Sequence, residues 1–85
     1  MNNELLSFKS QPENYAKECD GRKPNTLRFF GSPDDREQTL QVWSKTGDYG
    51  RICIVNSENR DFFIRKVTDI TYYEAWWIIS WEHPR

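Results

Sequence analysis

The stretch DFFIRKVTDITYYEAWWIISW, residues 61–81, decides the fold of this 85-residue chain. It is rich in aromatic and β-branched side chains, which favour β-strands. We predict one long strand over residues 61–74 and a final strand over residues 75–81. The final segment is apolar on both faces, which is typical of a central or barrel-closing strand. A β-sheet is therefore expected to form the centre of the fold.

The long strand does not alternate cleanly between apolar and polar residues. Phe63 and Val67 fit one face, whereas Ile64 and Ile70 fit the other. We therefore expect a bulge or bend near residues 65–66, because an extra residue changes the face on which the following side chains lie.

The tryptophans of the final strand divide between its two faces. A domain of this size needs a core that is dense in large side chains. Trp77, Ile79 and Trp81 share one face and are predicted to belong to the core. Trp76 lies on the opposite face and is a candidate surface for stacking a nucleobase.

The segments before residue 61 predict four further elements. Apolar residues favour strands over residues 4–9, 25–30 and 51–55. Between the first two of these strands, helical spacing predicts a helix over residues 12–20 that ends at Gly21.

A second helix is predicted over residues 32–45. Ser32 is the expected N-cap, Pro33 the first helical residue, and Asp35 completes a capping-box arrangement. The sequence TLQVW, residues 39–43, also fits a hairpin strand, so this segment has two interpretations.

The fold class that these elements predict is a single α+β domain over residues 1–85. We expect a small, partly closed β-barrel of about five mostly antiparallel strands with one or two short helices. Closure of a sheet hides the strand edges that otherwise promote aggregation.

Composition limits the classes of function. The formal net charge is −1, so no global positive field attracts polyanions, and any contact with nucleic acid must be local. Cys19 and Cys53 have no CxxC spacing, and with no apolar leader or long apolar run we expect a cytoplasmic protein without a membrane span. Because His83 is the single histidine, we expect no metal site and no cofactor.

The segment DGRKPNTLR, residues 20–28, carries most of the functional signal. Alternation predicts that Leu27 and Phe29 face inward, which leaves Thr26 and Arg28 together on the other face. A threonine hydroxyl and a guanidinium in this position can bind a phosphate or a base edge, and the Lys23 amine lies close in sequence.

Four residues of this segment resemble the G-x-K-x-x-T-x-R signature of ASCH domains in the PUA-like superfamily, namely Gly21, Lys23, Thr26 and Arg28. The order of strands and helices is similar too, so the resemblance spans nearly the whole chain. It implies a PUA-like β-barrel that binds RNA or modified nucleosides.

One branch of that family contains amidohydrolases that deacetylate acetylated cytidine with a lysine, a threonine and a later glutamate. By this resemblance Lys23 and Thr26 are candidate catalytic residues. Glu74, at the start of the final strand, is the candidate carboxylate, because strand ends can meet in a closed barrel.

We therefore predict a small module that binds RNA or a modified nucleotide in a cleft rimmed by Lys23, Thr26 and Arg28. Two alternatives stay open, an amidohydrolase of acylated nucleosides and a protein-interaction factor on the same scaffold. The segment can also be an ordinary solvated turn in which Arg28 forms a surface ion pair. The further candidates for nucleic-acid binding are Arg22, Arg65, Lys66 and Trp76.

Overall fold

The predicted long strand is present and organises the sheet. In the computed structural model, which describes residues 2–83, strand β4 (Phe62–Tyr73) pairs with two different neighbours. Its first half pairs with β3 (Arg51–Asn56) and its second half with β5 (Trp76–Trp81), both antiparallel. Strand β1 (Leu5–Ser10) adds to β3 in parallel, and β2 (Asn25–Phe29) adds antiparallel to β5. The strand order is β1-β3-β4-β5-β2.

The irregularity of β4 lies two residues later than predicted. The register shifts between Val67 and Asp69 rather than at residues 65–66. Val67 and Ile70, three residues apart, are therefore both buried, although an undistorted strand would direct them to opposite faces. The expectation that Ile70 shares a face with Ile64 is wrong, since Ile64 is exposed.

The first helix agrees with its prediction. Helix α1 (Pro12–Asp20) starts with a proline, whose missing N–H is no loss in the first turn. It ends at Gly21, which has a φ of 88° and so occupies the left-handed region that glycine adopts without strain. The helix packs against β3 at one end of the sheet.

The second predicted helix is also present, but its N-cap was predicted wrongly. Helix α2 (Asp35–Thr46) begins after Asp34, not after Ser32. The Asp34 carboxylate accepts a hydrogen bond of 2.9 Å from the Arg36 backbone N–H and also pairs with the Arg36 guanidinium. Asp34 thus accepts hydrogen bonds from both the backbone and the side chain of Arg36.

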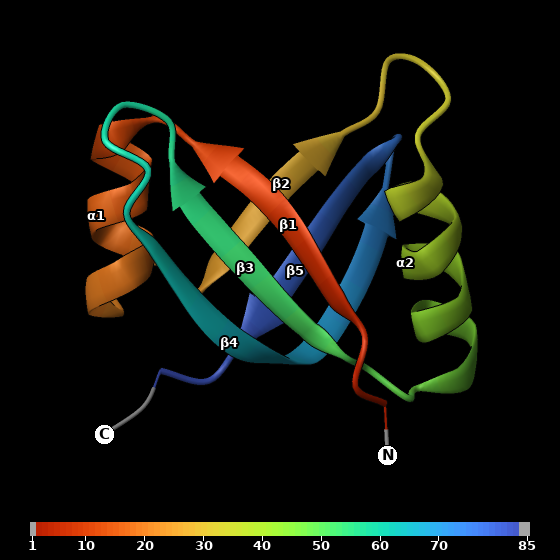
Figure 1. Ribbon diagram of the computed structural model, residues 1–85. Helices are drawn as coiled ribbons and strands as arrows, with labels where there is room; N and C mark the ends of the chain where they lie inside the picture. Colours follow the sequence, from red (N-terminus) through yellow and green to blue (C-terminus); the bar gives the residue numbers. More distant parts are fainter. Residues whose placement is uncertain (1, 84–85) are drawn as a thin grey trace.

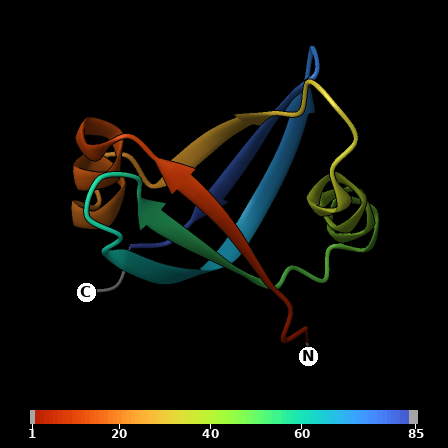
Figure 2. The ribbon, with the colours of Figure 1, turned by 45° about the horizontal axis from the view of Figure 1, so that its top comes forward.

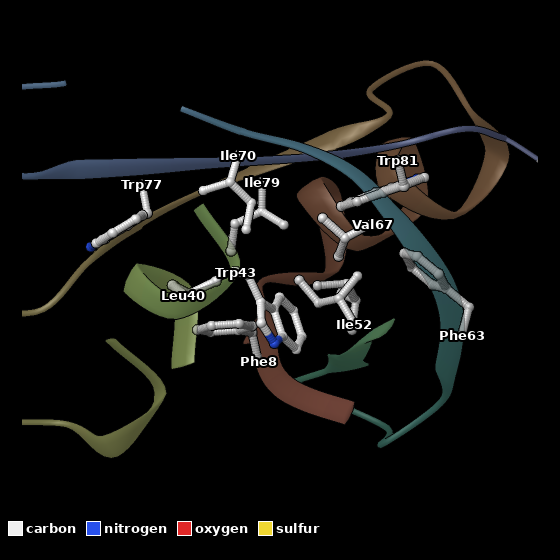
Figure 3. Packing of buried hydrophobic residues seen from close by; sticks show 11 residues of the cluster. Phe8, Leu40, Trp43, Ile52, Phe63, Val67, Ile70, Trp77, Ile79 and Trp81 are labelled. Carbon is white, nitrogen blue, oxygen red and sulfur yellow. The ribbon is translucent and has the colours of Figure 1, made fainter. Parts of the chain in front are cut away.

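The core lies inside the curled sheet and is closed on one side by α2 (Figures 1 and 3). Helix α2 contributes Leu40 and Trp43, which are fully buried. The prediction that Trp77, Ile79 and Trp81 are core residues is confirmed. The buried hydrophobic cluster consists of Phe8, Leu40, Trp43, Ile52, Ile54, Phe63, Val67, Ile70, Trp77, Ile79 and Trp81.

Strand β2 is turned the opposite way from the prediction. Leu27 and Phe29 are 48% and 55% exposed, whereas Thr26 is 2% exposed. The cause is the register with β5, which places Thr26 opposite Ile79 and therefore on the buried face. The alternating pattern correctly predicted that Leu27 and Phe29 lie on the opposite face from Thr26. It was wrong about which of the two faces is buried.

The sheet curls but does not close. Figures 1 and 2 show β1 and β3 crossing in front of β2 and β5, with the two helices on opposite sides. Strands β1 and β2 are the two edges of the sheet and do not pair with each other. The fold is thus α+β, with a five-stranded mixed sheet, three antiparallel pairings, one parallel pairing and two helices. Within residues 2–83, neither helix is long and apolar enough to cross a membrane.

Candidate functional site

A cavity of about 210 Å³ lies where β1, α1 and β2 meet. Three of the four signature residues, Lys23, Thr26 and Arg28, line it, and Gly21 does not. The full lining consists of Lys9, Ser10, Gln11, Asn14, Glu18, Lys23, Thr26, Leu27, Arg28 and Ser57. Ten residues from four segments of the chain thus surround one polar space, which we call the signature cavity.

Arg28 connects the two edge strands at this cavity. Its Nη1 donates a hydrogen bond of 2.7 Å to the backbone oxygen of Lys9, and its Nη2 donates one of 2.8 Å to Ser10 Oγ. Its guanidinium carbon lies 4.9 Å from the centre of the Phe8 ring. Burial lowers the pKa of the Arg28 guanidinium, and the negative charge of Glu18 opposes that change. Arg28 therefore forms a fixed wall of the cavity and not a mobile surface charge.

Two hydroxyl groups in the cavity wall are oriented by Arg28. Thr26 Oγ1 accepts a hydrogen bond of 3.0 Å from Arg28 Nε, and Ser10 Oγ accepts from Arg28 Nη2. Both side chains are buried. A hydroxyl that accepts from a guanidinium still has its own O–H to donate. Ser10 and Thr26 therefore each keep an O–H that can donate a hydrogen bond.

Glu18 is the residue of this cavity that our sequence reasoning missed. It is 1% exposed, and its Oε1 atom has no hydrogen-bond partner among the described residues. Acidic side chains are rarely fully buried without a partner. A signal was present in the sequence, because Glu18 follows Tyr15 by three residues and so shares the face of α1 that packs on the sheet.

The lysine of the signature is held near the cavity by the end of α1. The backbone N–H of Lys23 donates 3.0 Å to the Lys17 oxygen, which continues the helix cap formed at Gly21. The Lys23 side chain is half-buried and has no ion pair in the described part of the chain. The residue also lines the signature cavity.

Glu74 lies away from this site. Together with Ala75 it forms the turn between β4 and β5, where its φ is 49°. Thr26 is opposite Ile79, while Phe29 at the other end of β2 is opposite Trp76, next to that turn. At about 3.3 Å per residue, Glu74 is separated from Thr26 by roughly 10 Å or more along the strands. The expected meeting of Glu74 with the signature does not occur, and the acidic residue that lines the cavity is Glu18.

The other basic residues that we predicted lie elsewhere. Arg22 is exposed and pairs with Asp20 at 2.7 Å, and its backbone and side-chain hydrogen bonds lower the pKa of the Asp20 carboxyl. Arg65 donates to the Cys19 backbone oxygen at the end of α1, a favourable position for a cation. Lys66 donates to the backbone oxygen of Tyr49. Arg65 and Lys66 therefore do not share a groove with the signature.

Trp76 belongs to a separate exposed surface on the outer side of the sheet. It is 46% exposed, and its ring centre lies 5.5 Å from that of Phe29 on the neighbouring strand. Leu27 and Tyr73 are exposed beside them. Strand β5 is central in the sheet, between β4 and β2, as predicted, and the face that carries Trp76 is its more exposed one.

A second, larger cavity of about 460 Å³ adjoins the first and shares Lys9 and Arg28 with it. Arg36 contributes a second guanidinium, which donates 2.7 Å to the Ser7 backbone oxygen and lies 4.5 Å from the centre of the Phe8 ring. Both cations thus bind carbonyl groups at the free edge of β1. The second cavity is lined by Ser7, Phe8, Lys9, Arg28, Phe29, Phe30, Arg36 and Val55.

Comparisons of the chain with protein-family models, with curated proteins and with solved structures gave no match. Within residues 2–83, no three His, Cys, Asp or Glu side chains are grouped as metal ligands. The polar side chains that line the signature cavity are hydroxyls, cations, amides and one carboxylate.

Proposed function

We propose that this protein is a small binding module for RNA or a modified nucleotide, and that the signature cavity receives the ligand. One observation supports the proposal most strongly: Lys23, Thr26 and Arg28, grouped in the sequence, line the same cavity as the buried carboxylate of Glu18. Glu18 comes from a different element, α1, so its place beside this group does not follow from closeness in the sequence.

The proposal includes membership of the ASCH and PUA-like proteins. The α+β fold with a curled sheet supports this assignment, as does the position of the signature, which runs from the end of α1 into β2. The approach of β1 to β2 through Arg28 also supports a barrel-like arrangement, although side chains and not paired strands connect those edges.

The groups around the cavity suit the parts of a nucleotide. The exposed ammonium of Lys9 and the half-buried one of Lys23 are suited to a phosphate at the mouth. The hydroxyls and the carboxylate are suited to the polar edge of a base. Two cations give a shallow dependence on salt, with a slope of about −0.7 for each phosphate neutralised on a single strand.

The test is a titration of the protein with mixed-sequence single-stranded RNA and with the four ribonucleoside 5′-monophosphates at two salt concentrations. Lys23→Ala should weaken binding, because it removes an ammonium that has no structural ion pair. Lys45→Ala, in the last turn of α2, is the control and should bind as the wild type does. Equal affinity of wild type and Lys23→Ala would contradict the proposal. Arg28→Ala is a poor test here, since Arg28 also connects the edge strands.

A second candidate function is hydrolysis of an acylated nucleoside, and the burial of Glu18 favours it. A lysine, a threonine hydroxyl and a carboxylate in one cavity are the groups of a general acid–base set. In this candidate Glu18 takes the role that we first assigned to Glu74. Chromatography of acetylated cytidine incubated with wild type, Lys23→Ala, Glu18→Gln and Glu74→Gln tests it. Turnover that depends on Glu18 and not on Glu74 is expected, and turnover that survives Lys23→Ala would exclude it.

A further inference from the structure

The second cavity, of about 460 Å³, is lined by cations and by no carboxylate. Its charged lining residues are Lys9, Arg28 and Arg36. Lys9 is exposed, and both arginines are half-buried, so all three can be reached from solvent. Glu18 lines the signature cavity instead, and Asp34 lines neither of the two. A hollow with this lining attracts an anion.

Two of these cations have no ion pair. Within residues 2–83, Arg36 pairs with Asp34 at 2.7 Å. Arg28 and Lys9 form no ion pair in the same part of the chain. Burial lowers the pKa of the Arg28 guanidinium, Glu18 opposes that change, and the positive charge of Arg36 adds to it. The two guanidinium groups therefore repel each other, and an anion bound in the cavity that both line would relieve that repulsion.

Both guanidinium groups are held in place by β1. Arg28 donates a hydrogen bond of 2.7 Å to the Lys9 backbone oxygen. Arg36 donates one of 2.7 Å to the Ser7 backbone oxygen. Their guanidinium carbons lie 4.9 and 4.5 Å from the centre of one ring, that of Phe8. Because the donors are already ordered, a ligand loses less binding free energy in fixing them.

Each guanidinium keeps donors for a ligand. Arg28 donates one hydrogen bond each through Nε, Nη1 and Nη2 to groups of the protein, and Arg36 does the same. A guanidinium has five N–H groups, so two on each arginine are not used among the described residues. Guanidinium groups form paired hydrogen bonds with the oxygens of a phosphate.

We infer that the second cavity binds a phosphate monoester, with Arg28, Arg36 and Lys9 as its cationic partners. A phosphate monoester carries a charge of about −1.5 to −2 at pH 7 and three terminal oxygens. This charge balances the two cations that have no ion pair. A phosphodiester has one negative charge and two such oxygens, so it matches the lining less well.

The position of the second cavity next to the first suits a nucleotide. The cavities share Lys9 and Arg28, so a nucleotide whose base occupies the signature cavity can place its phosphate in the second one. The apolar part of the lining is suited to the carbon atoms of the ribose and consists of Phe8, Phe29, Phe30 and Val55. The assignment of the phosphate to a nucleotide rests on the proposed function, whereas the phosphate site itself does not.

The experiment measures binding by calorimetry of inorganic phosphate, the four ribonucleoside 5′-monophosphates, their 3′,5′-cyclic monophosphates and the nucleosides. Wild type should bind the 5′-monophosphates about tenfold or more tightly than the nucleosides, because the nucleosides lack the charge-assisted hydrogen bonds. The cyclic nucleotides are diesters and should bind more weakly than the 5′-monophosphates. Arg36→Gln should remove the preference for the phosphate. Arg22→Gln should keep it and is the matched control, since Arg22 also pairs at 2.7 Å with an aspartate two residues earlier but lines neither cavity.

The melting temperature of each variant shows whether it is folded, and the comparison of 5′-monophosphates with cyclic nucleotides tests the inference on wild type alone. Equal binding of these two sets, or of 5′-monophosphates and nucleosides, would overturn the inference and leave the proposed function intact. A preference for the phosphate that survives in folded Arg36→Gln would do the same. Binding of inorganic phosphate that requires Arg36, without binding of any nucleotide, would support the phosphate site and contradict the proposed function. Failure of wild type to bind any of these compounds would overturn both.

Discussion

The two helices stand on opposite sides of the curled sheet and bury different chemistry (Figure 1). Helix α2 places Leu40 and Trp43 in the core, with exposed fractions of 0% and 1%. Helix α1 buries only Glu18 to the same extent, and its Tyr15 and Cys19 are half-buried. One helix closes the hydrophobic core, and the other forms the wall of a polar cavity.

The comparison of the two helices suggests that α2 contributes mainly to stability and that α1 contributes to the candidate site. The apolar side chains that α2 buries stabilise the fold, so their loss should lower the free energy of unfolding of the whole domain. Helix α1 instead buries Glu18, whose Oε1 has no hydrogen-bond partner in the described structure, and such a group opposes folding. Variants on the α2 side should therefore change stability most, whereas variants on the α1 side should change binding.

The largest expected effect follows from Trp43→Ala. The substitution removes a fully buried ring from the core and should lower the free energy of unfolding by about 3–5 kcal/mol. Chemical denaturation followed by circular dichroism measures it. Val42→Ala, on the exposed side of α2, is the matched control and should change stability by less than about 0.5 kcal/mol. Similar losses in the free energy of unfolding for both variants would contradict the conclusion that the buried face of α2 stabilises the fold.

An intermediate effect is expected for Thr26→Val, which keeps the shape of the side chain but removes its oxygen. Arg28 Nε would lose its 3.0 Å acceptor in a buried setting, with a loss of about 1–3 kcal/mol in stability. Thr71→Val, whose hydroxyl is exposed on the outer face, should be nearly neutral. If Thr26→Val were neutral too, the oriented hydroxyl would not be part of the folded architecture.

A smaller effect is expected from acid at the N-terminus of α2. The hydrogen bonds from Arg36 lower the pKa of Asp34 from 3.8 to about 2. Because the folded-state value lies below the unfolded one, this contribution to stability is present above about pH 4 and is lost as the pH falls toward 2. Melting temperatures of wild type and Asp34→Asn should therefore differ at pH 6 and converge near pH 2. A difference that is the same at both pH values would contradict the role of this ion pair.

The smallest effect on stability is expected for Trp76→Ala, on the outer face of β5. Its ring contacts Phe29 but remains 46% exposed, so the loss should be below about 1 kcal/mol. Trp77→Ala, one residue along and buried, provides the comparison and should approach the loss of Trp43→Ala. If Trp76 also stacks a base, its variant should weaken binding of single-stranded RNA without unfolding the protein.

The local pattern of apolar and polar residues was enough to predict which segments form strands or helices and in what order they follow. Alternation and composition predicted five strands, and the proline and glycine around residues 12–21 fixed both ends of α1. The grouping of Lys23, Thr26 and Arg28 also followed from the sequence, because residues two and three apart in a short segment cannot separate in space. These features depend on neighbouring residues alone.

Tertiary structure decided which side of each element is buried. Alternation in β2 separates Thr26 from Leu27, but only the register with β5 determines which of them faces the core. The bulge of β4 likewise depends on its change of partner from β3 to β5, not on residues 65–66 alone. Tertiary packing also determined which acidic residue lines the signature cavity. Glu18 of α1 lines it together with residues of β2, whereas Glu74 lies in the turn between β4 and β5. The sequence of a strand or helix determines which of its side chains share a face. Contacts with other elements determine which of those faces is buried. The candidate site lies between several elements, so it depends on these contacts.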